Sequence, residues 1–272
     1  LHRMTLSFTT PRRFSSALSG HPIMFNSGEL ADSLSMEHLT RAGREFIPWF
    51  GQIQNAYLFM LTKSDNVDDI LDLAHNGHTI IAWSLNNETI SKKFEIGAPS
   101  FERRLIAARK VQEAGYRLRI RLDPIVPIDG WEEQYARTVD EIFKKISPET
   151  VTLGTLRFEE GFYRMRNTLF SKGTEAAQYL DSMEPMFPSK VFPGSKKPKS
   201  GKYSFTEEKR TGIFDFVIKE IRKYSDCPVA LCKESANVWN RLGLPLSECR
   251  CVCQLDSADM SAKMQSGTDF DS

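Results

Sequence analysis

Polar side chains stand directly after several short apolar runs in this sequence. They are Ser27, Gly28, Glu29, Lys63, Ser84 and Asn86. A carboxylate accepts hydrogen bonds from an ammonium group. Lysine, hydroxyl and amide side chains donate hydrogen bonds to a carboxylate or a ribose, and glycine lets the backbone approach a ligand closely. Each residue alone has a plainer explanation, as a solvated lysine or as a cap between strand and turn. Together, at the ends of neighbouring strands, they predict a binding site.

The segment Arg117–Asp123 alternates charged with aliphatic residues. If it is a strand of a parallel barrel, its aliphatic side chains face the helices, and Arg119 and Arg121 point into the lumen. Buried guanidinium groups need anionic partners, which can be Asp123, Glu29, or a carboxylate or phosphate of a ligand. The alternative is an edge strand with one wetted face. The first interpretation places Arg119, Arg121 and Asp123 on the substrate side of the predicted site.

Short buried strands alternate with amphipathic helices along the chain. The predicted strands cover residues 21–25, 56–62, 79–85, 118–126, 151–158 and 228–232, and the predicted helices cover residues 36–46, 68–74, 99–115, 132–146 and 206–224. This alternation is typical of repeated βα units around a parallel sheet. The sequence lacks the phosphate-binding motifs G-x-G-x-x-G and G-x-x-x-x-G-K-S/T. We therefore predict an α/β fold with a partial barrel, whose chemistry lies at the carboxyl ends of the strands.

The composition is that of an ordinary globular protein. Of the 272 residues, 40% are hydrophobic and 26% are charged, and the formal net charge is +1. This charge gives no overall attraction to nucleic acid or to a membrane surface. The longest apolar run, residues 56–61, is far too short to cross a bilayer, and the first residues lack the features of a signal peptide. We expect a cytoplasmic protein without a membrane partner.

All five cysteines lie in the last fifth of the chain. They are Cys227, Cys232, Cys249, Cys251 and Cys253. Their spacing lacks the CxxC pairs of zinc sites, so a structural role is the more common explanation and metal binding is the alternative. The histidines show no ligand spacing either, and His75 and His78 flank an Asn-Gly turn. The sequence therefore predicts no metal ligands.

A proline- and lysine-rich insertion occupies residues 182–205, with Tyr203 and Phe205 as its expected anchors. Its lysines suit a phosphate backbone, and a solvated loop is the alternative. We expect residues 1–14 to be a poorly ordered start, residues 15–255 to form the partial barrel with this insertion, and residues 256–272 to form a disordered tail.

Several segments, in this order and spacing, resemble one family. They are 25–34 (FNSGELADSL), 61–64 (LTKS), 82–86 (AWSLN), 98–104 (APSFERR), 114–116 (AGY), 123–125 (DPI), 130–133 (GWEE) and 231–234 (LCKE). They look like the spore photoproduct lyase family of radical S-adenosylmethionine (radical SAM) enzymes. The resemblance extends over residues 15–255.

This resemblance implies a partial (βα)6 TIM-like barrel with S-adenosylmethionine and a 4Fe-4S cluster as cofactors. In this family the cluster passes an electron to S-adenosylmethionine, and the resulting radical abstracts a hydrogen atom from a methylene-bridged thymine lesion in DNA. The resemblance therefore implies a DNA repair lyase that acts on DNA or a nucleotide and needs an electron donor. It also points to residues 27–29, 63, 84 and 86 as the S-adenosylmethionine site.

Two features depart from the family pattern. The CxxxCxxC cluster motif, which lies upstream of the position of His21 in the family, is absent, and the sequence starts at Leu1. Because three thiolates hold such a cluster, we expect either that the sequence begins after the cluster segment or that the chain is a non-catalytic nucleic-acid-binding remnant. The hydrogen-donating cysteine of the family corresponds to Asn26, whose amide N–H bond is too strong to give up a hydrogen atom.

Overall fold

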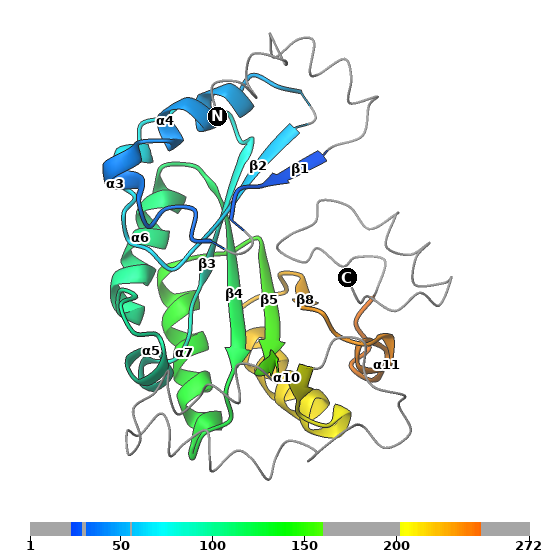
Figure 1. Cartoon of the computed structure of the whole chain (residues 1–272). Helices are drawn as coiled ribbons and strands as arrows, with labels where there is room; N and C mark the ends of the chain where they lie inside the picture. Colours follow the sequence, from blue (N-terminus) through cyan, green and yellow to red (C-terminus); the bar gives the residue numbers. More distant parts are fainter. Residues whose placement is uncertain (1–22, 29–30, 55, 160–201, 246–272) are drawn as a thin grey trace.

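Six parallel strands form one open, half-barrel sheet (Figure 1). The computed structural model describes residues 23–28, 31–54, 56–159 and 202–245. In spatial order, the strands are β1 (Ile23–Asn26), β2 (Ala56–Thr62), β3 (Thr79–Ser84), β4 (Arg117–Ile125), β5 (Thr150–Thr155) and β8 (Val229–Leu231). The spatial order follows the chain order, as consecutive βα units require. The predicted α/β partial barrel is therefore confirmed.

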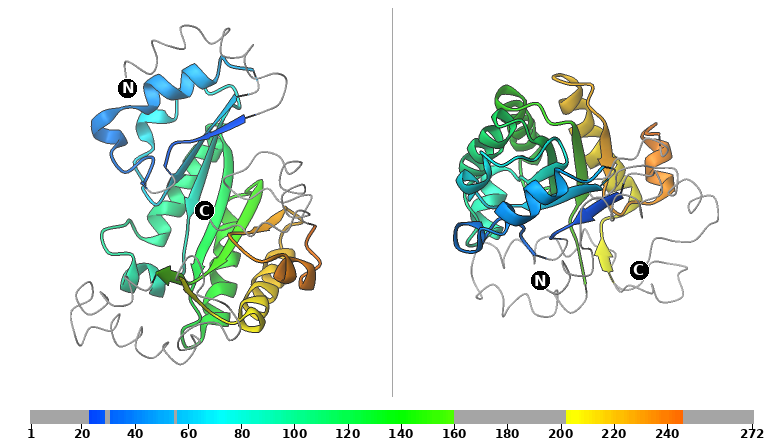
Figure 2. Two further views of the ribbon diagram at one scale, coloured as in Figure 1. Left: turned by 45° about the vertical axis from the view of Figure 1, so that its right-hand side comes forward. Right: turned by 90° about the horizontal axis from the view of Figure 1, so that it is seen from above.

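Helices pack against the outer face of this sheet (Figure 2). The helices of the described residues are α3 (Glu37–Thr40), α4 (Gly43–Phe50), α5 (Glu88–Phe94), α6 (Phe101–Glu113), α7 (Trp131–Lys145), α10 (Glu207–Arg222), α11 (Ala236–Arg241), which packs against α10, and the 3-10 helix η1 (Asp68–Ile70). Helix α4 contacts β2, α6 contacts β4, and α10 contacts β5. The opposite face of the sheet is called the concave face below.

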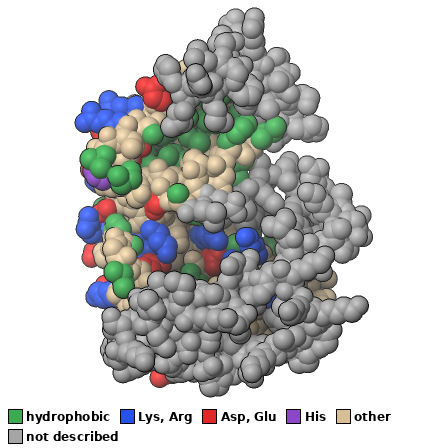
Figure 3. Space-filling view, in the orientation of Figure 1, with side chains coloured by type: hydrophobic (Ala, Val, Ile, Leu, Met, Phe, Trp, Pro, Cys, Tyr) green, Lys and Arg blue, Asp and Glu red, His purple; other side chains and the backbone are tan. Residues whose placement is uncertain are grey.

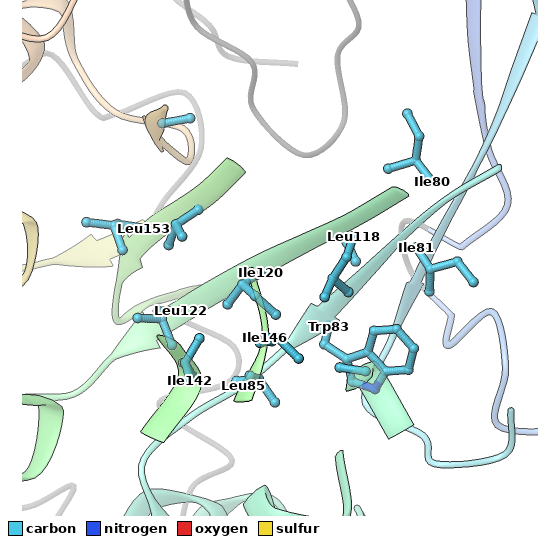
Figure 4. Packing of buried hydrophobic residues seen from close by; sticks show 14 of the residues in the cluster. Ile80, Ile81, Trp83, Leu85, Leu118, Ile120, Leu122, Ile142, Ile146 and Leu153 are labelled. Atoms are coloured by element: carbon cyan, nitrogen blue, oxygen red, sulfur yellow. The ribbon is translucent and has the colours of Figure 1, made fainter. Parts of the chain in front are cut away.

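Strand β4 separates aliphatic from charged side chains, as its alternating sequence predicts. Leu118, Ile120 and Leu122 are buried and lie on the same side as Ile142 and Ile146 (Figure 4). The arginines between them project to the concave face because successive residues of a strand alternate in direction. Strand β4 pairs with β3 on one side and with β5 on the other, so the edge-strand alternative is wrong.

Helix α6 begins and ends where its sequence signals predict. The Ser100 hydroxyl accepts a hydrogen bond from the backbone N–H of Arg103, which caps the first turn. Gly115 follows the last turn with a φ of +87°, a conformation that glycine adopts without strain. The predicted inward stripe, which consists of Phe101, Leu105, Ala108 and Val111, is buried.

Two predicted helices differ from the structure. The helix predicted over residues 36–46 is divided into α3 and α4, because Arg41 adopts a left-handed conformation with a φ of 49°. The helix predicted over residues 68–74 is reduced to η1, where the backbone pairs at i,i+3 spacing, with the N–H of Leu73 donating to the carbonyl of Ile70 at 3.3 Å. The Tyr116 hydroxyl donates to the same carbonyl at 2.6 Å. Helices α5 and α11 were not predicted, because segments of 7 and 6 residues are too short to show a helical apolar repeat.

The strand predicted over residues 151–158 also ends early. Strand β5 stops at Thr155, and β6 (Arg157–Glu159) pairs antiparallel with β7 (Lys202–Ser204) in a separate two-stranded sheet. Phe205, an expected anchor of the insertion, is fully buried.

Other predictions fall outside the described residues. These are the terminal segments 1–14 and 256–272, the insertion up to residue 201, the side chain of Tyr203, and the cysteines at 249, 251 and 253. Among the helices that the structure describes, none is long and apolar enough to cross a membrane.

Candidate functional site

A chain of ion pairs joins the carboxyl ends of β2 and β3. Lys63 follows β2, and its Nζ lies 2.8 Å from Oε1 of Glu95. The other carboxylate oxygen of Glu95 lies 2.5 Å from Nη2 of Arg104. Arg104 donates through Nη1 to the carbonyl of Ser84, at 2.9 Å, and through Nη2 to the hydroxyl of Ser91. Lys63 and Ser84, two of the predicted site residues, are therefore linked at the edge of the sheet.

The carboxylate of Glu95 is strongly stabilised in its charged form. Burial alone would raise the pKa of Glu95, but the positive charges of Lys63 and Arg104 outweigh burial and hold the pKa below its ordinary value. Arg104 is fully buried, and a buried guanidinium needs an anionic partner of this kind. Lys63 is thus held at the end of β2 by a carboxylate that stays ionised at neutral pH.

The segment after β1 is attached to the end of β2. The hydroxyl of Ser27 donates to the carbonyl of Phe59 at 3.1 Å. Asp32 accepts through Oδ1 from the Thr62 hydroxyl and through Oδ2 from the backbone N–H of Lys63, at 2.7 and 2.6 Å. Gly28 is buried, and a Cβ there would lie 2.5 Å from the Ser33 hydroxyl oxygen, so this turn accepts no side chain. Glu29 lies outside the described residues.

Asn86 connects the ends of β3 and β4 and faces the protein interior. Its side-chain amide donates to the carbonyl of Pro124 at 2.9 Å. Its side-chain oxygen accepts from the Tyr135 hydroxyl at 2.6 Å and from the backbone N–H of Asn87. Asn86 is only 1% exposed, so these contacts position the strand ends.

A second polar cluster lies farther along the same edge, over β4, β5 and β8. Arg121 and Arg157 both donate to Oδ2 of Asp123, with their Nη2 atoms at 2.5 and 3.1 Å. The same two Nη2 atoms lie 3.2 and 3.1 Å from the sulfur of Cys232. We call Arg121, Asp123, Arg157 and Cys232 the guanidinium clamp. Lysine and arginine side chains also occur across the middle of the described surface, with acidic groups among them (Figure 3).

Gly154 makes room for the carboxylate of the clamp. A Cβ at this position of β5 would lie 2.5 Å from Oδ1 of Asp123 and 2.8 Å from its Oδ2. The sheet is irregular here, since the register between β4 and β5 shifts between Leu122 and Ile125. The Asp123 carboxylate therefore lies directly over the backbone of β5, with its side chain 7% exposed.

Arg119 is separated from the clamp and lies nearer to the amino end of the sheet. It is 1% exposed, and its Nε lies 2.5 Å from Oε1 of Glu149, which also pairs with Arg117. Burial alone would raise the pKa of Glu149, but the hydrogen bonds from Arg117 and the charge of Arg119 outweigh it and lower the pKa. The structure therefore divides the predicted group of Arg119, Arg121 and Asp123 between two places.

Several important residues were not assigned by sequence reasoning. They are Asp32, Glu95, Arg104, Glu149 and Cys232. The rule that selects Lys63 at the end of a strand also selects Arg157, which follows β5, and Cys232, which follows β8. Glu95 and Glu149 have no comparable signal, because their partners are up to 32 residues away.

The described residues suit one of the two implied cofactors, S-adenosylmethionine, but not the other, a 4Fe-4S cluster. Lys63 and the Ser84 hydroxyl, on neighbouring strand ends, provide the kinds of donors that bind a carboxylate or ribose, which suits S-adenosylmethionine. In the described part of the chain the cysteines are Cys227 and Cys232, and no three His, Cys, Asp or Glu side chains there could hold a metal ion. These residues do not fit a 4Fe-4S cluster, which needs three thiolates.

Comparison with known proteins gives consistent matches. The family model described as spore photoproduct lyase matches residues 13–226. The spore photoproduct lyase of Geobacillus sp. is 37% identical over 135 residues, which are 50% of this chain and 39% of that protein. That of Bacillus subtilis is 36% identical over 118 residues, 43% of this chain and 34% of that protein. That of Clostridium acetobutylicum is 24% identical over 214 residues, 74% of this chain and 58% of that protein.

Solved structures agree with these matches. A spore photoproduct lyase complexed with dinucleoside spore photoproduct is 26% identical, with a TM-score of 0.69, and the match covers 81% of this chain and 64% of that one. A mutant form with bound AdoMet and dinucleoside spore photoproduct has a TM-score of 0.68 at 26% identity, over 81% of this chain and 63% of that one. This chain thus spans less than two thirds of each of these relatives. Because the family model covers well over half of the sequence, the chain belongs to the spore photoproduct lyase family.

Proposed function

We propose that this chain provides the half-barrel of a radical SAM lyase that acts on a photoproduct in DNA or in a nucleotide. The observation that carries the proposal is the linked edge formed by the ends of β1, β2 and β3, where the Lys63–Glu95–Arg104 chain meets the Ser84 carbonyl. In open α/β sheets, ligands bind at this edge. The related lyase with bound AdoMet and dinucleoside spore photoproduct supports the same assignment.

The proposed cofactor site consists of Ser27, Gly28, Glu29, Lys63, Ser84 and Asn86. Lys63 would bind the carboxylate of S-adenosylmethionine, Ser84 would donate to the same group or to the ribose, and Glu29 would accept from the ammonium group. Gly28 would allow close approach of the backbone, and Asn86 would act by positioning the ends of β3 and β4. When bound, S-adenosylmethionine supplies the capacity for hydrogen-atom abstraction from the substrate.

The substrate side is proposed to be the concave face near the clamp. Arg121 and Asp123 lie on this face at the carboxyl edge, whereas Arg119 is buried in its ion pair with Glu149. We therefore propose Arg121 and Asp123 as substrate-facing residues, and we propose that Arg119 supports the sheet beneath them. A cluster and an electron donor would have to complete the enzyme, because the described residues provide no cluster ligands.

A binding experiment tests the cofactor site without needing turnover. S-adenosylhomocysteine, a stable analogue, is titrated into the 272-residue chain, and binding is followed by isothermal calorimetry. We expect the Lys63→Ala variant to bind about tenfold more weakly or worse, because it loses a charge-assisted hydrogen bond to the carboxylate. The matched control is Lys92→Ala, which removes a surface lysine that pairs with Glu88 four residues away. Equal affinity of the two variants would contradict the proposed site.

A further inference from the structure

We propose that the guanidinium clamp is a binding subsite for an oxyanion, either a phosphate or a carboxylate group. The proposal rests on the proposed function only in taking the concave face as the substrate side. Its new content is that Arg121 and Arg157 act together as the anion-binding pair, and that Asp123 and Gly154 position this pair.

The first argument is the convergence of the two arginines. Their Nη2 atoms contact the same two acceptors, Oδ2 of Asp123 and the sulfur of Cys232. A guanidinium is a planar fork of N–H donors that matches the geometry of carboxylate and phosphate oxygens. Two such forks with common contact points form a pre-arranged set of donors.

The second argument concerns the quality of the acceptors. Asp123 offers a carboxylate oxygen, but the second shared acceptor is the sulfur of Cys232, and thiol sulfur accepts hydrogen bonds weakly. Donors that face a weak acceptor gain when an oxyanion approaches them, since charge-assisted hydrogen bonds to oxygen are shorter and stronger. The clamp therefore favours an additional oxygen ligand beside the sulfur.

The third argument is the combination of rigidity and access. Arg157 also donates through Nη1 to the carbonyl of Cys232 at 3.2 Å, and the Asp123 carboxylate is fitted over Gly154. The side chains of Arg121 and Arg157 nevertheless remain 23% exposed each. Partial burial reduces screening by water and strengthens the attraction for an anion, while the exposed part leaves room for contact.

Arg117 provides an internal comparison. It lies on the same strand and the same face as Arg121, four residues earlier, which is roughly 13 Å along the strand. Its guanidinium makes a two-pronged contact with Glu149 and lies over the ring of Tyr57. The Arg117 contacts are those of a structural ion pair, and Arg117 is therefore a matched control for the clamp.

The experiment uses inorganic phosphate as the probe and the 272-residue chain without S-adenosylmethionine. Saturable binding is measured by phosphorus NMR or calorimetry at low ionic strength. We expect Arg157→Gln and Arg121→Gln to weaken phosphate binding about tenfold or more, and Arg117→Gln to leave it unchanged. No saturable binding to the wild-type chain, or equal weakening by Arg117→Gln, would overturn the proposal.

Two further variants keep the test decisive. If circular dichroism shows that Arg157→Gln is unfolded, Arg157→Lys takes its place. Lysine keeps the positive charge but loses the planar fork of donors, so this variant should still bind phosphate severalfold more weakly. An unchanged phosphate affinity in Arg157→Lys would contradict the clamp. If only Cys232→Ala binds phosphate and the wild-type chain does not, the sulfur itself occupies the anion position, and the proposal is wrong.

Competition distinguishes the two sources of the oxyanion. A phosphodiester source is indicated if thymidylyl-(3′→5′)-thymidine displaces phosphate and thymidine does not. A carboxylate source is indicated if acetate displaces phosphate as well as the dinucleotide does. Both outcomes support the oxyanion subsite. Because no S-adenosylmethionine is present, a failure here leaves the Lys63 experiment intact, and a failure of that experiment leaves this one intact.

Discussion

At the scale of single residues, Glu95 connects Lys63 with Arg104. Its side chain is 7% exposed and pairs with both cations. Removing one partner of a buried ion pair leaves an uncompensated charge, which costs about 3 to 5 kcal/mol. We expect Glu95→Gln to destabilise the protein by about 3 kcal/mol, since the fully buried Arg104 loses its carboxylate. Urea unfolding at pH 7 measures this difference.

The control for Glu95 is Glu113, another glutamate that pairs with an arginine. Glu113 pairs with Arg109 on the exposed surface of α6, in an i,i+4 arrangement. Exposed pairs of this kind contribute at most about 0.5 kcal/mol. A Glu95→Gln variant no less stable than Glu113→Gln would show that the buried chain does not stabilise the strand ends.

Substitution by alanine is expected to change the stability of the protein in opposite directions at two glycines. Gly154→Ala places a Cβ 2.5 Å from Oδ1 of Asp123, and such overpacking costs about 1 to 3 kcal/mol. Gly212 lies inside α10 with no atom within 4 Å of the added Cβ, so Gly212→Ala should stabilise the protein by about 0.5 to 1 kcal/mol. Thermal unfolding of both variants measures the two shifts. A stabilising Gly154→Ala would disprove the close approach of Asp123.

Residue roles were predictable only where the signal was local. Lys63 and Ser84 could be selected because each stands at the end of an apolar run, and these strand ends lie together in the structure. Arg121 could be assigned to the lumen from the alternation of β4. The pairing of Arg121 with Arg157, by contrast, joins positions that are 36 residues apart, and Glu95 reaches Lys63 across 32 residues. Such pairings depend on how the elements pack.

At the scale of elements, helix α6 fixes the position of Arg104 and thus of the Ser84 strand end. Its N-cap is Ser100, whose hydroxyl accepts from the N–H of Arg103 at 3.3 Å. Loss of such a cap costs about 1 kcal/mol. We expect Ser100→Ala to lower the free energy of unfolding by about this amount, while Ser100→Asp, which keeps an acceptor, should have little effect. Denaturant unfolding curves compare the variants, and equal losses in both would argue against capping.

The elements that could be predicted share strong patterns. Strands β2 and β3 are continuous apolar runs, and each run is followed by residues typical of turns. Helices α6 and α7 carry regular apolar stripes. Helix α5 holds the apolar residues Ile90 and Phe94 among polar ones, and its cap, Asn87, follows another asparagine, so the sequence resembles a turn. The short helix is instead stabilised by this cap and by its packing.

At the scale of the whole molecule, two ion-pair centres stabilise opposite ends of the same sheet. Glu95 joins the carboxyl ends of β2 and β3, and Glu149 joins the amino ends of β4 and β5. The register places Ile80 beside Arg117 and Ser84 beside Arg121, so the two centres are separated by about four residues of strand, roughly 13 Å. Sites at this separation without shared partners contribute additively to stability.

The two centres contribute to the way stability depends on acidity, as do Asp140 and Glu208, whose pKa values are also lowered by hydrogen bonds. The pKa values of Glu95 and Glu149 are lowered in the folded state from the ordinary 4.5. A carboxyl group with a lowered pKa binds protons more readily when unfolded, so its contribution is complete above pH 4.5 and is lost as the pH falls through the folded-state value. Glu37 acts in the opposite direction, because burial raises its pKa and its contribution is lost as the pH rises.

A double variant tests additivity and acid sensitivity together. We expect the stability losses of Glu95→Gln and Glu149→Gln at pH 7 to add within about 0.5 kcal/mol. The double variant should also lose less stability than the wild-type chain between pH 5 and pH 3, because two of the carboxyl groups with lowered pKa values are absent, while Asp140, Glu208 and Glu37 are present in both proteins. Urea unfolding at several pH values measures both quantities. A double variant as acid-sensitive as the wild-type chain would place the acid-labile groups elsewhere, and a strongly non-additive loss would mean that the two ends of the sheet are coupled.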